Sequence, residues 1–183
     1  DRAFGGLLVT GGAGFIGSCY VRDVLGRRAE TTITVLDKLT YAGNESNLDP
    51  VRADPEAAAR LRFVQGDIAD TDLVASLIGD ADAIVNFAAE SHVDRSILDP
   101  EAFLRTGVIG VHVLLEACRT APARPRFLQV STDEVYGSLG DTGLFTETTP
   151  LAPSSPYSAS KASADLLVLA NHHTFGQEVV VTR

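Results

Sequence analysis

Several features that mark other classes of protein are missing from this sequence of 183 residues. It has only two cysteines, Cys19 and Cys118, and their spacing fits neither a metal site nor a redox motif. We expect both cysteines to lie in helices with their side chains buried, where they only fill space in the core. No apolar run approaches the roughly 18 residues that a membrane span needs, and no signal peptide precedes the first predicted strand. These absences argue against a membrane protein or a disulfide scaffold, and they favour an enzyme of the cytoplasm.

The sequence also lacks an excess of basic residues. Its 15 lysines and arginines against 24 aspartates and glutamates give a formal net charge of −9, which argues against nucleic acid as a partner. The apolar content of 45% and the length fit one globular domain with a real core, over residues 1–183. Methionine is absent, and the sequence ends directly after a strand-like run. We therefore expect a further C-terminal region in the full protein.

Predicted strands and helices alternate along the whole sequence, without an internal repeat. Short apolar runs predict buried strands, and longer segments with apolar residues every three or four positions predict helices. This alternation is typical of an α/β protein with a doubly wound parallel sheet of the Rossmann type. The expected strands are 5–10, 32–36, 61–65, 83–87, 127–130 and 179–182, the expected helices are 18–28, 54–60, 71–78, 101–120 and 162–174, and a long loop is expected at 138–155.

Three glycines follow the first predicted strand with the spacing GxxGxxG, namely Gly11, Gly14 and Gly17. In dinucleotide-binding folds the first glycine permits a tight turn, and the second lets the backbone approach a pyrophosphate. The third lets the following helix pack closely on the strand, and that helix offers free amides and a partial positive charge to the phosphates. The motif therefore predicts a dinucleotide site.

Asp37 ends the second predicted strand, 20 residues after Gly17. A carboxylate there accepts hydrogen bonds from the adenosine ribose and repels a 2′-phosphate, which favours NAD over NADP, although Lys38 beside it weakens that argument. The alternative is a carboxylate that only caps a helix or closes a turn. After the third predicted strand, Asp67 is expected near the adenine amino group and Ile68 against the adenine ring.

The fourth predicted strand leads into small residues, Ala88 and Ala89, which would let a nicotinamide ribose come close. The polar residues 90–96 that follow are placed to contact a substrate. His92 lies among them, but we expect no direct catalytic role for it. The other histidines are expected to pack or to cap helices, and no set of His, Cys and carboxylate residues has the spacing of a metal site.

Tyr157 and Lys161 are four residues apart, so on a helix their side chains share one face. A phenol has an unperturbed pKa of about 10, and a nearby ammonium would lower that pKa so that the phenolate can act as a base. Thr132, Asp133 and Glu134 follow the fifth predicted strand, at the sheet edge where open α/β folds keep their ligands. These five groups are therefore predicted to converge on one crevice, the alternatives being a chance Tyr–Lys spacing and a solvated turn.

Four stretches make the sequence resemble the extended short-chain dehydrogenase/reductases and, among them, the dTDP-glucose 4,6-dehydratases of deoxysugar biosynthesis. They are Thr10 to Gly17, Asp37 to Asn44, Ala88 to Ser96, and Ser131 to Gly137 with Tyr157 to Lys161. The Thr-Asp-Glu triplet is the most specific, because relatives that only epimerise or reduce do not need two carboxylates there.

The resemblance implies NAD as cofactor, dTDP-glucose or a related nucleotide sugar as substrate, and a homodimer. Thr132 and Ser91 would contact the substrate. The family usually has Asn and Thr where this sequence has Gly107 and Val111, and its C-terminal region, which builds most of the nucleotide-sugar site, would lie beyond residue 183. The implied cofactor contacts are Gly11, Gly14, Phe15, Ile16, Gly17, Asp37, Lys38, Leu39, Thr40, Asp67, Ile68, Phe87, Ala88, Ala89, Glu90, Ser91, Thr106, Tyr157 and Lys161.

The residues fit that chemistry. Tyr157 would take the proton of the sugar 4-hydroxyl as hydride leaves carbon 4, Thr132 would hydrogen-bond that oxygen, and Lys161 would tune Tyr157. Glu134 would then remove the proton of carbon 5, and Asp133 would protonate the departing 6-hydroxyl. The alternatives are a nucleotide-sugar 4-epimerase or decarboxylase of the same fold, and a catalytically silent NAD-binding module.

Overall fold

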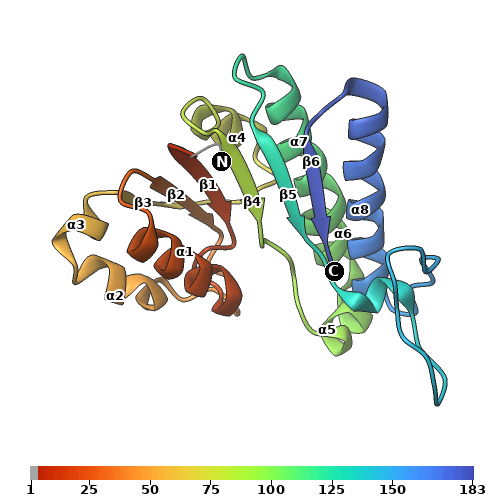
Figure 1. The fold of residues 1–183 in the computed structure, drawn as a ribbon. Helices are drawn as coiled ribbons and strands as arrows, with labels where there is room; N and C mark the ends of the chain where they lie inside the picture. The colour runs from red at the N-terminus through yellow and green to blue at the C-terminus, as the bar shows by residue number, and fades with distance from the viewer. Residues whose placement is uncertain (1–3) are drawn as a thin grey trace.

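A single sheet of six parallel strands runs through the computed structural model, which describes residues 4–183 (Figure 1). The strand order is β3-β2-β1-β4-β5-β6, so the direction of winding switches between β1 and β4. This is the doubly wound arrangement that the sequence predicts; the first three residues of the predicted domain lie outside the described part. The strands are β1 (Gly6–Thr10), β2 (Thr32–Asp37), β3 (Leu61–Gln65), β4 (Ala83–Asn86), β5 (Arg126–Val130) and β6 (Val179–Thr182).

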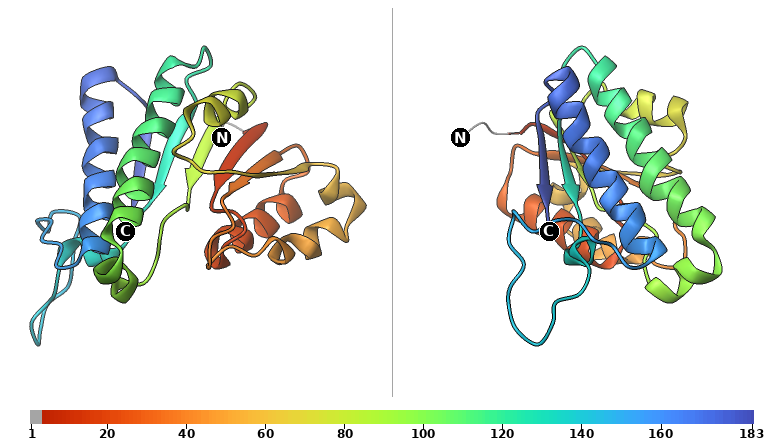
Figure 2. Two further views of the ribbon diagram at one scale, coloured as in Figure 1. Left: turned by 180° about the vertical axis from the view of Figure 1, so that it is seen from behind. Right: turned by 90° about the vertical axis from the view of Figure 1, so that its right-hand side faces the viewer.

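Helices cover both faces of the sheet. Figure 2 shows α7 and α8 side by side on one face, and it shows the long loop at 138–155 projecting near the start of α8. The helices are α1 (Phe15–Arg27), α2 (Asp49–Arg52), α3 (Pro55–Ala58), α4 (Thr71–Leu77), α5 (Val93–Leu98), α6 (Pro100–Leu104), α7 (Val111–Thr120) and α8 (Pro156–Phe175), with 3₁₀ helices η1 (Glu45–Leu48) and η3 (Asp133–Tyr136) and a π-helical turn η2 (Arg105–Gly110).

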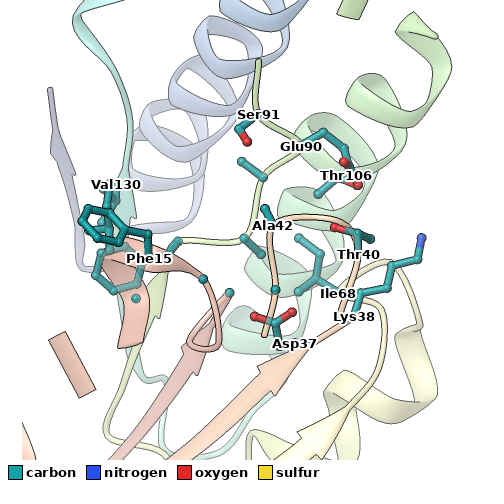
Figure 3. A pocket seen from close by; sticks show the side chains of 18 of the residues that line it. Phe15, Asp37, Lys38, Thr40, Ala42, Ile68, Glu90, Ser91, Thr106 and Val130 are labelled. Carbon is teal, nitrogen blue, oxygen red and sulfur yellow. The ribbon is translucent and has the colours of Figure 1, made fainter. Parts of the chain in front are cut away.

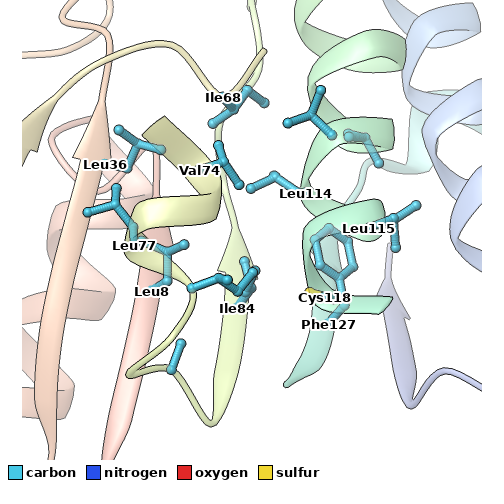
Figure 4. Close-up of a cluster of buried hydrophobic side chains, with 14 of the residues drawn as sticks. Leu8, Leu36, Ile68, Val74, Leu77, Ile84, Leu114, Leu115, Cys118 and Phe127 are labelled. Carbon is cyan, nitrogen blue, oxygen red and sulfur yellow. The ribbon is translucent and has the colours of Figure 1, made fainter. Parts of the chain in front are cut away.

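Covering both faces explains why the strands are nearly continuous apolar runs. In β1, Leu7 and Val9 belong to the cluster under α1, α2 and α3, whereas Leu8 belongs to the cluster under α4, α7 and α8. In Figure 4, Leu114 of α7 lies across from Leu8 and Ile84 of the strands. Because each face has its own apolar core, the carboxyl ends of the strands are held rigidly for the loops that follow them.

The predicted strands and helices exist, but helix ends shift, one predicted helix is divided and two short helices were not predicted; helix α8 begins at Pro156 instead of residue 162. Helix α1 begins at Phe15 instead of residue 18, because the glycine turn is short enough to lead directly into it. The predicted helix 101–120 consists of α6, the wide turn η2 and α7. The short helices α2 and α5 were not predicted, since four to six residues are too few to show an apolar period.

The two cysteines differ in burial. Cys118 packs in the core as predicted, and burial raises the pKa of its thiol to about 12. Cys19 is exposed, so the prediction that it fills buried space is wrong. The buried positions of α1 include Ser18, Val21 and Leu25, and this spacing turns residue 19 outward.

Candidate active site

A cavity of about 500 Å³ opens at the carboxyl ends of the strands, where the winding direction switches (Figure 3). Open α/β sheets bind their ligands in this place. The loops after β1 to β5 line it together with the first turns of α8. The lining residues are Gly11, Gly14, Phe15, Ile16, Gly17, Leu36, Asp37, Lys38, Thr40, Ala42, Gly43, Gly66, Asp67, Ile68, Phe87, Ala88, Ala89, Glu90, Ser91, His92, Thr106, Val130, Ser131, Tyr157 and Lys161.

The glycine loop, residues 10–17, is shaped by the absence of side chains. Gly11 has a φ of +68°, and a Cβ there would lie 2.6 Å from the backbone nitrogen of Ala88. A Cβ on Gly17 would lie 2.3 Å from the carbonyl oxygen of Gly11. At Gly14, which lines the cavity, the nearest atom to a Cβ would be that same oxygen, at 3.3 Å. The first and third glycines thus have the turn and packing roles that the spacing predicts, and the approach of Gly14 to a pyrophosphate stays a prediction.

Asp37 is buried at the end of β2, and each oxygen of its carboxylate accepts a backbone N–H. Ala13 donates to one and Leu39 to the other, both at 2.9 Å. The carboxylate therefore does close a turn, the alternative left open by the sequence, and it ties β2 to the glycine loop. Asp37 also lines the cavity, so its remaining lone pairs are available to ribose hydroxyls. Leu39 does not line the cavity; its contribution is the backbone N–H that it donates to Asp37.

Asp67, after β3, lies beside two cations. The Nζ of Lys38 is 2.9 Å from its Oδ2, and the Nε of Arg105 is 3.8 Å away. Burial by itself would raise the pKa of Asp67, but the Ala69 N–H and the two cations outweigh burial and hold that pKa below its usual value. An ionised carboxylate at this place can accept a hydrogen bond from an amino group, which fits the predicted adenine contact.

Tyr41 joins two loops beside the cavity, a contact that the sequence did not reveal. Its hydroxyl donates to the carbonyl oxygen of Ser91 and accepts the Ser91 N–H at 2.8 Å. The guanidinium of Arg95 lies 3.8 Å from the centre of the Tyr41 ring. His92, next to Ser91, has a φ of +75°, which is strained for a residue other than glycine. Since Ser91 and His92 line the cavity, Tyr41 fixes one side of it.

Helix α8 presents Tyr157 and Lys161 to the cavity, as their spacing predicts. The helix starts at this place because of a capping box. The Ser158 N–H donates to the Ser155 side chain and the Ser155 N–H to the Ser158 side chain, each at 3.0 Å, and Pro156 follows the cap. The serines and the proline thus decide where the phenol and the amine lie.

Lys161 is buried, and its amine donates a hydrogen bond to the carbonyl oxygen of Val130 at 2.7 Å. Burial lowers the pKa of Lys161 to about 8, and the charge of Asp165, one turn further along α8, opposes that shift. The amine therefore keeps its proton only up to mildly alkaline pH.

Residues 131–137, which include the predicted catalytic residues and are called the catalytic segment below, lie next to Tyr157. Burial raises the pKa of Tyr157, a hydrogen bond with Thr132 lowers it, and the charges of Glu134 and Asp133 raise it. The net shift of the Tyr157 pKa is upward, and Lys161 is not among the groups that change it. The prediction that Lys161 lowers this pKa is therefore wrong. Thr132, Asp133 and Glu134 do not line the cavity itself. Thr132 caps η3, and Asp133 and Glu134 begin it with both carboxylates exposed.

The wide turn η2 brings Thr106 to the cavity, where it was predicted (Figure 3). A Cβ on the neighbouring Gly107 would lie 3.1 Å from the Cβ and Oγ of Ser160, so a larger residue would require Ser160 to move. Ser160 donates instead to the carbonyl oxygen of Tyr157 at 2.7 Å. Val111 is buried in the apolar core. Gly107 and Val111, which stand where the family usually has Asn and Thr, therefore supply no polar side chain to this part of the site.

Every predicted cofactor contact except Leu39 therefore lines the cavity. Seven lining residues were not among the predicted contacts, and most of them are small or apolar neighbours of residues that were. A small or apolar side chain carries no chemical signal, so adjacency was the only available clue. They are Leu36, Ala42, Gly43, Gly66, His92, Val130 and Ser131.

Within residues 4–183, no group of three or more His, Cys, Asp or Glu side chains could hold a metal ion. In the same described range, no helix combines the length and apolar character needed to cross a membrane.

Residues 8–183 match the sequence profile of the family described as GDP-mannose 4,6 dehydratase. The chain belongs to this family. The match includes the glycine loop beyond β1, the catalytic segment and the start of α8, which are the parts that meet at the cavity.

Similar proteins carry related names. A dTDP-glucose 4,6-dehydratase from Streptomyces antibioticus is 56% identical over 182 residues, which are 97% of this chain and 52% of that protein. The crystal structure of a dTDP-glucose 4,6-dehydratase from Streptomyces venezuelae, with NAD and TYD bound, is 54% identical with a TM-score of 0.90 and covers 97% of this chain and 55% of that one. A UDP-glucose 4-epimerase from Thermus thermophilus in complex with NAD is 31% identical with a TM-score of 0.84, covering 97% and 54%. The chain thus spans about half the length of the relatives it matches.

Proposed function

We propose that the full-length protein containing this chain is an NAD-dependent lyase that removes water from dTDP-glucose, giving the 4-keto-6-deoxy sugar. One observation carries the proposal: the hydroxyl of Thr132 and the carboxylates of Asp133 and Glu134 all lie close enough to Tyr157 to act on the pKa of its phenol. Oxidation at carbon 4 needs a phenol and a hydroxyl. Loss of water from carbons 5 and 6 needs an additional acid and base, and two carboxylates supply them.

The cavity fits NAD. Gly14 has no Cβ to fill the space beside the glycine loop, and the amides of Phe15 and Ile16 begin α1 at the cavity. Asp37 and Asp67 both line the cavity, where Asp37 would accept hydrogen bonds from the adenosine ribose and Asp67 from the adenine amino group. When bound, NAD supplies a hydride acceptor for carbon 4 and a hydride donor for carbon 6.

The first half of the reaction belongs to Tyr157 and its neighbours. Tyr157 takes the proton of the 4-hydroxyl, and Thr132 hydrogen-bonds the same oxygen. The pKa of Tyr157 is raised with Lys161 already in place, so a further positive charge beside the ring is needed to favour the phenolate. Lys161, a buried cation on the same helix face, would hold the ribose hydroxyls of the bound cofactor.

The second half belongs to the two carboxylates. The 4-ketone acidifies the proton on carbon 5, and Glu134 removes it. Asp133 donates a proton to the departing 6-hydroxyl, which leaves as water. Both side chains are exposed on η3 and act on the pKa of Tyr157, so they are accessible to a sugar bound beside that phenol.

Mass spectrometry of the product formed from dTDP-glucose by the full-length protein tests the reaction. Loss of one water without net oxidation or reduction is the expected result. An unchanged mass would indicate epimerisation or no reaction, and the proposal would fall.

Two variants separate the two halves. Tyr157→Phe should abolish formation of reduced cofactor in a single turnover. Glu134→Gln should oxidise the sugar but slow loss of the carbon 5 proton by about 10²–10⁴-fold, so reduced cofactor accumulates. Equal absence of reduced cofactor in both variants would mean that Glu134 acts at or before oxidation.

The proposal includes a C-terminal region that completes the sugar site, a cytoplasmic location and a homodimer. Free thiols at Cys19 and Cys118 suit a reducing compartment.

Large apolar side chains are exposed on α5, α6, η2 and α8, which contact one another, and such surfaces are typical of subunit contacts. Sedimentation of the full-length protein should give the mass of two chains. The exposed apolar residues are Ile97, Leu98, Leu104, Ile109, Leu166 and Leu169.

A further inference from the structure

Asp165 is completely buried on α8, one turn after Lys161, and has no part in the proposed reaction. Ser131 donates from its hydroxyl to Oδ2 of Asp165 at 2.9 Å, and Arg183 donates from Nε to the same oxygen at 2.9 Å. A buried carboxylate is unfavourable unless it is paired, so its partners identify what it holds in place.

These partners lie on both sides of the catalytic residues. Ser131 directly precedes Thr132. Arg183, which follows β6, also donates from Nη1 to the hydroxyl of Tyr136 at 3.0 Å, and Tyr136 comes two residues after Glu134. The buried carboxylate therefore holds one end of the segment directly and the other end through Arg183.

The same helix holds the segment at a third point. The Lys161 amine donates to the carbonyl oxygen of Val130, immediately before Ser131. The ring of Tyr136 packs with Ala162 of α8 in a small apolar cluster. Helix α8 thus holds both flanks of Thr132, Asp133 and Glu134, and it is also the helix that carries Tyr157.

We propose that Asp165 and Arg183 are a positioning pair that fixes the catalytic segment to α8, so that the segment and Tyr157 keep their relative places. Neither residue touches the reacting atoms. The chemical consequence rests on the proposed function, whereas the holding itself is a property of the fold.

The charges around the pair make its parts interdependent. Two cations act on Asp165, namely Lys161 on α8 and Arg183 after β6. Besides Asp165, the titratable group that acts on Arg183 is the hydroxyl of Tyr136 on η3. Burial raises the pKa of Asp165, and the hydrogen bonds from Arg183 and Ser131 oppose that shift. Without the carboxylate, both Lys161 and Arg183 would lose the negative charge that acts on them.

Amide hydrogen exchange of the full-length protein tests the holding directly. In Asp165→Asn, exchange in residues 131–137 should become about tenfold faster or more, because the two hydrogen bonds lose their charged acceptor and weaken, while exchange in the glycine loop stays unchanged. The matched control is Arg126→Gln. It removes an exposed ion pair with Glu178 at the opposite end of β5 and β6, and it should leave residues 131–137 unaffected.

Single-turnover kinetics test the consequence for chemistry. In Asp165→Asn and Tyr136→Phe, the affinity for NAD should be kept while loss of water slows, by up to about 10²-fold for a displacement on the ångström scale. Arg183→Lys should also remove water more slowly than the unmodified protein, because an ammonium lacks the planar fork that reaches Asp165 and Tyr136 together.

Unchanged exchange in residues 131–137 of Asp165→Asn would overturn the proposal. An equal rise in the glycine loop would also overturn it, since the pair would then only stabilise the fold. If Asp165→Asn does not fold, Ser131→Ala and Tyr136→Phe, which each remove one hydrogen bond, decide the question by the same measurement. If the unmodified protein removes no water from dTDP-glucose, the proposed function fails, while the exchange data still decide the positioning role.

Discussion

Two loops follow parallel strands into the same cavity, and they are built in opposite ways. The glycine loop after β1 works by lacking side chains: a Cβ at Gly11 or Gly17 would overlap the backbone. The catalytic segment after β5 works through side chains, with Thr132 beside Tyr157 and the carboxylates of Asp133 and Glu134 exposed. The first loop is damaged by adding atoms and the second by removing them.

The difference also lies in what holds each loop. The shape of the glycine loop follows from its own backbone and from Asp37, which accepts N–H groups on either side. The catalytic segment is held from outside, by α8 and by the residue after β6. The glycine loop therefore depends on close backbone packing, including that of Gly11 on Ala88, whereas the catalytic segment depends on side chains of α8 and of the residue after β6.

A large effect is expected from removing one hydroxyl in the catalytic segment. Thr132→Val loses the hydroxyl that acts on the phenol of Tyr157, and formation of reduced cofactor from dTDP-glucose should slow by about 10²–10³-fold. The affinity for NAD, measured by calorimetry, should not change. Thr132→Ser keeps the hydroxyl and should restore most of the rate. Weaker NAD binding in Thr132→Val would show that the two loops are not separable.

The converse change adds atoms to the glycine loop. Gly14→Val should weaken NAD binding by about 10–100-fold, as overpacking does, with little change in the melting temperature of the cofactor-free protein. A Cβ at this position would meet its nearest atom at 3.3 Å. Gly17→Ala is the contrasting variant. Its Cβ would lie 2.3 Å from the Gly11 oxygen, so this variant should melt at a lower temperature even without cofactor.

A smaller effect is expected at Tyr41, which joins the loops after β2 and β4 beside the cavity. Tyr41→Phe keeps the ring under Arg95 but loses both hydrogen bonds to Ser91. Since one such bond contributes about 1 kcal/mol, NAD should dissociate roughly fivefold faster in a stopped-flow competition experiment. Unchanged release would mean that the glycine loop retains the cofactor without this contact.

The smallest change concerns stability. Burial lowers the pKa of Lys161 from 10.5 to about 8, so below pH 8 the folded protein keeps a buried charge at a cost in free energy. Between pH 8 and 10.5 the unfolded chain binds more protons than the folded one, and stability rises with pH. Lys161→Met should therefore raise the melting temperature of the cofactor-free protein at pH 7, by about 2–4 °C for 1 kcal/mol, and less at pH 10. Lys38→Met, at a half-exposed lysine, is the control and should show no such pH-dependent gain.

The contrast between the loops also explains what the sequence could predict. The spacing of Gly11, Gly14 and Gly17 is readable because only glycine satisfies that geometry. The strands were predicted because both faces are apolar, and the Tyr157/Lys161 pair because helical spacing sets it. These features depend on a few neighbouring residues.

The features that were missed depend on residues far apart in the chain. Tyr41 and Ser91 are 50 residues apart, and Asp165 reaches Ser131 across 34. The upward pKa of Tyr157 depends on burial, which no short pattern reveals. The outward position of Cys19 depends on which side of α1 faces the sheet. Such facts follow only once the helices are packed on the sheet.

Lys38 and Lys161 are the only lysines in the chain, and both line the cavity. An amine reacts with acylating reagents in its neutral form, and with a pKa of about 8 roughly one Lys161 in ten is neutral at pH 7. Lys38 is half exposed and serves as an internal reference. Acylation followed by peptide mass spectrometry would therefore report, at two named positions and without any introduced label, whether a ligand fills the cavity.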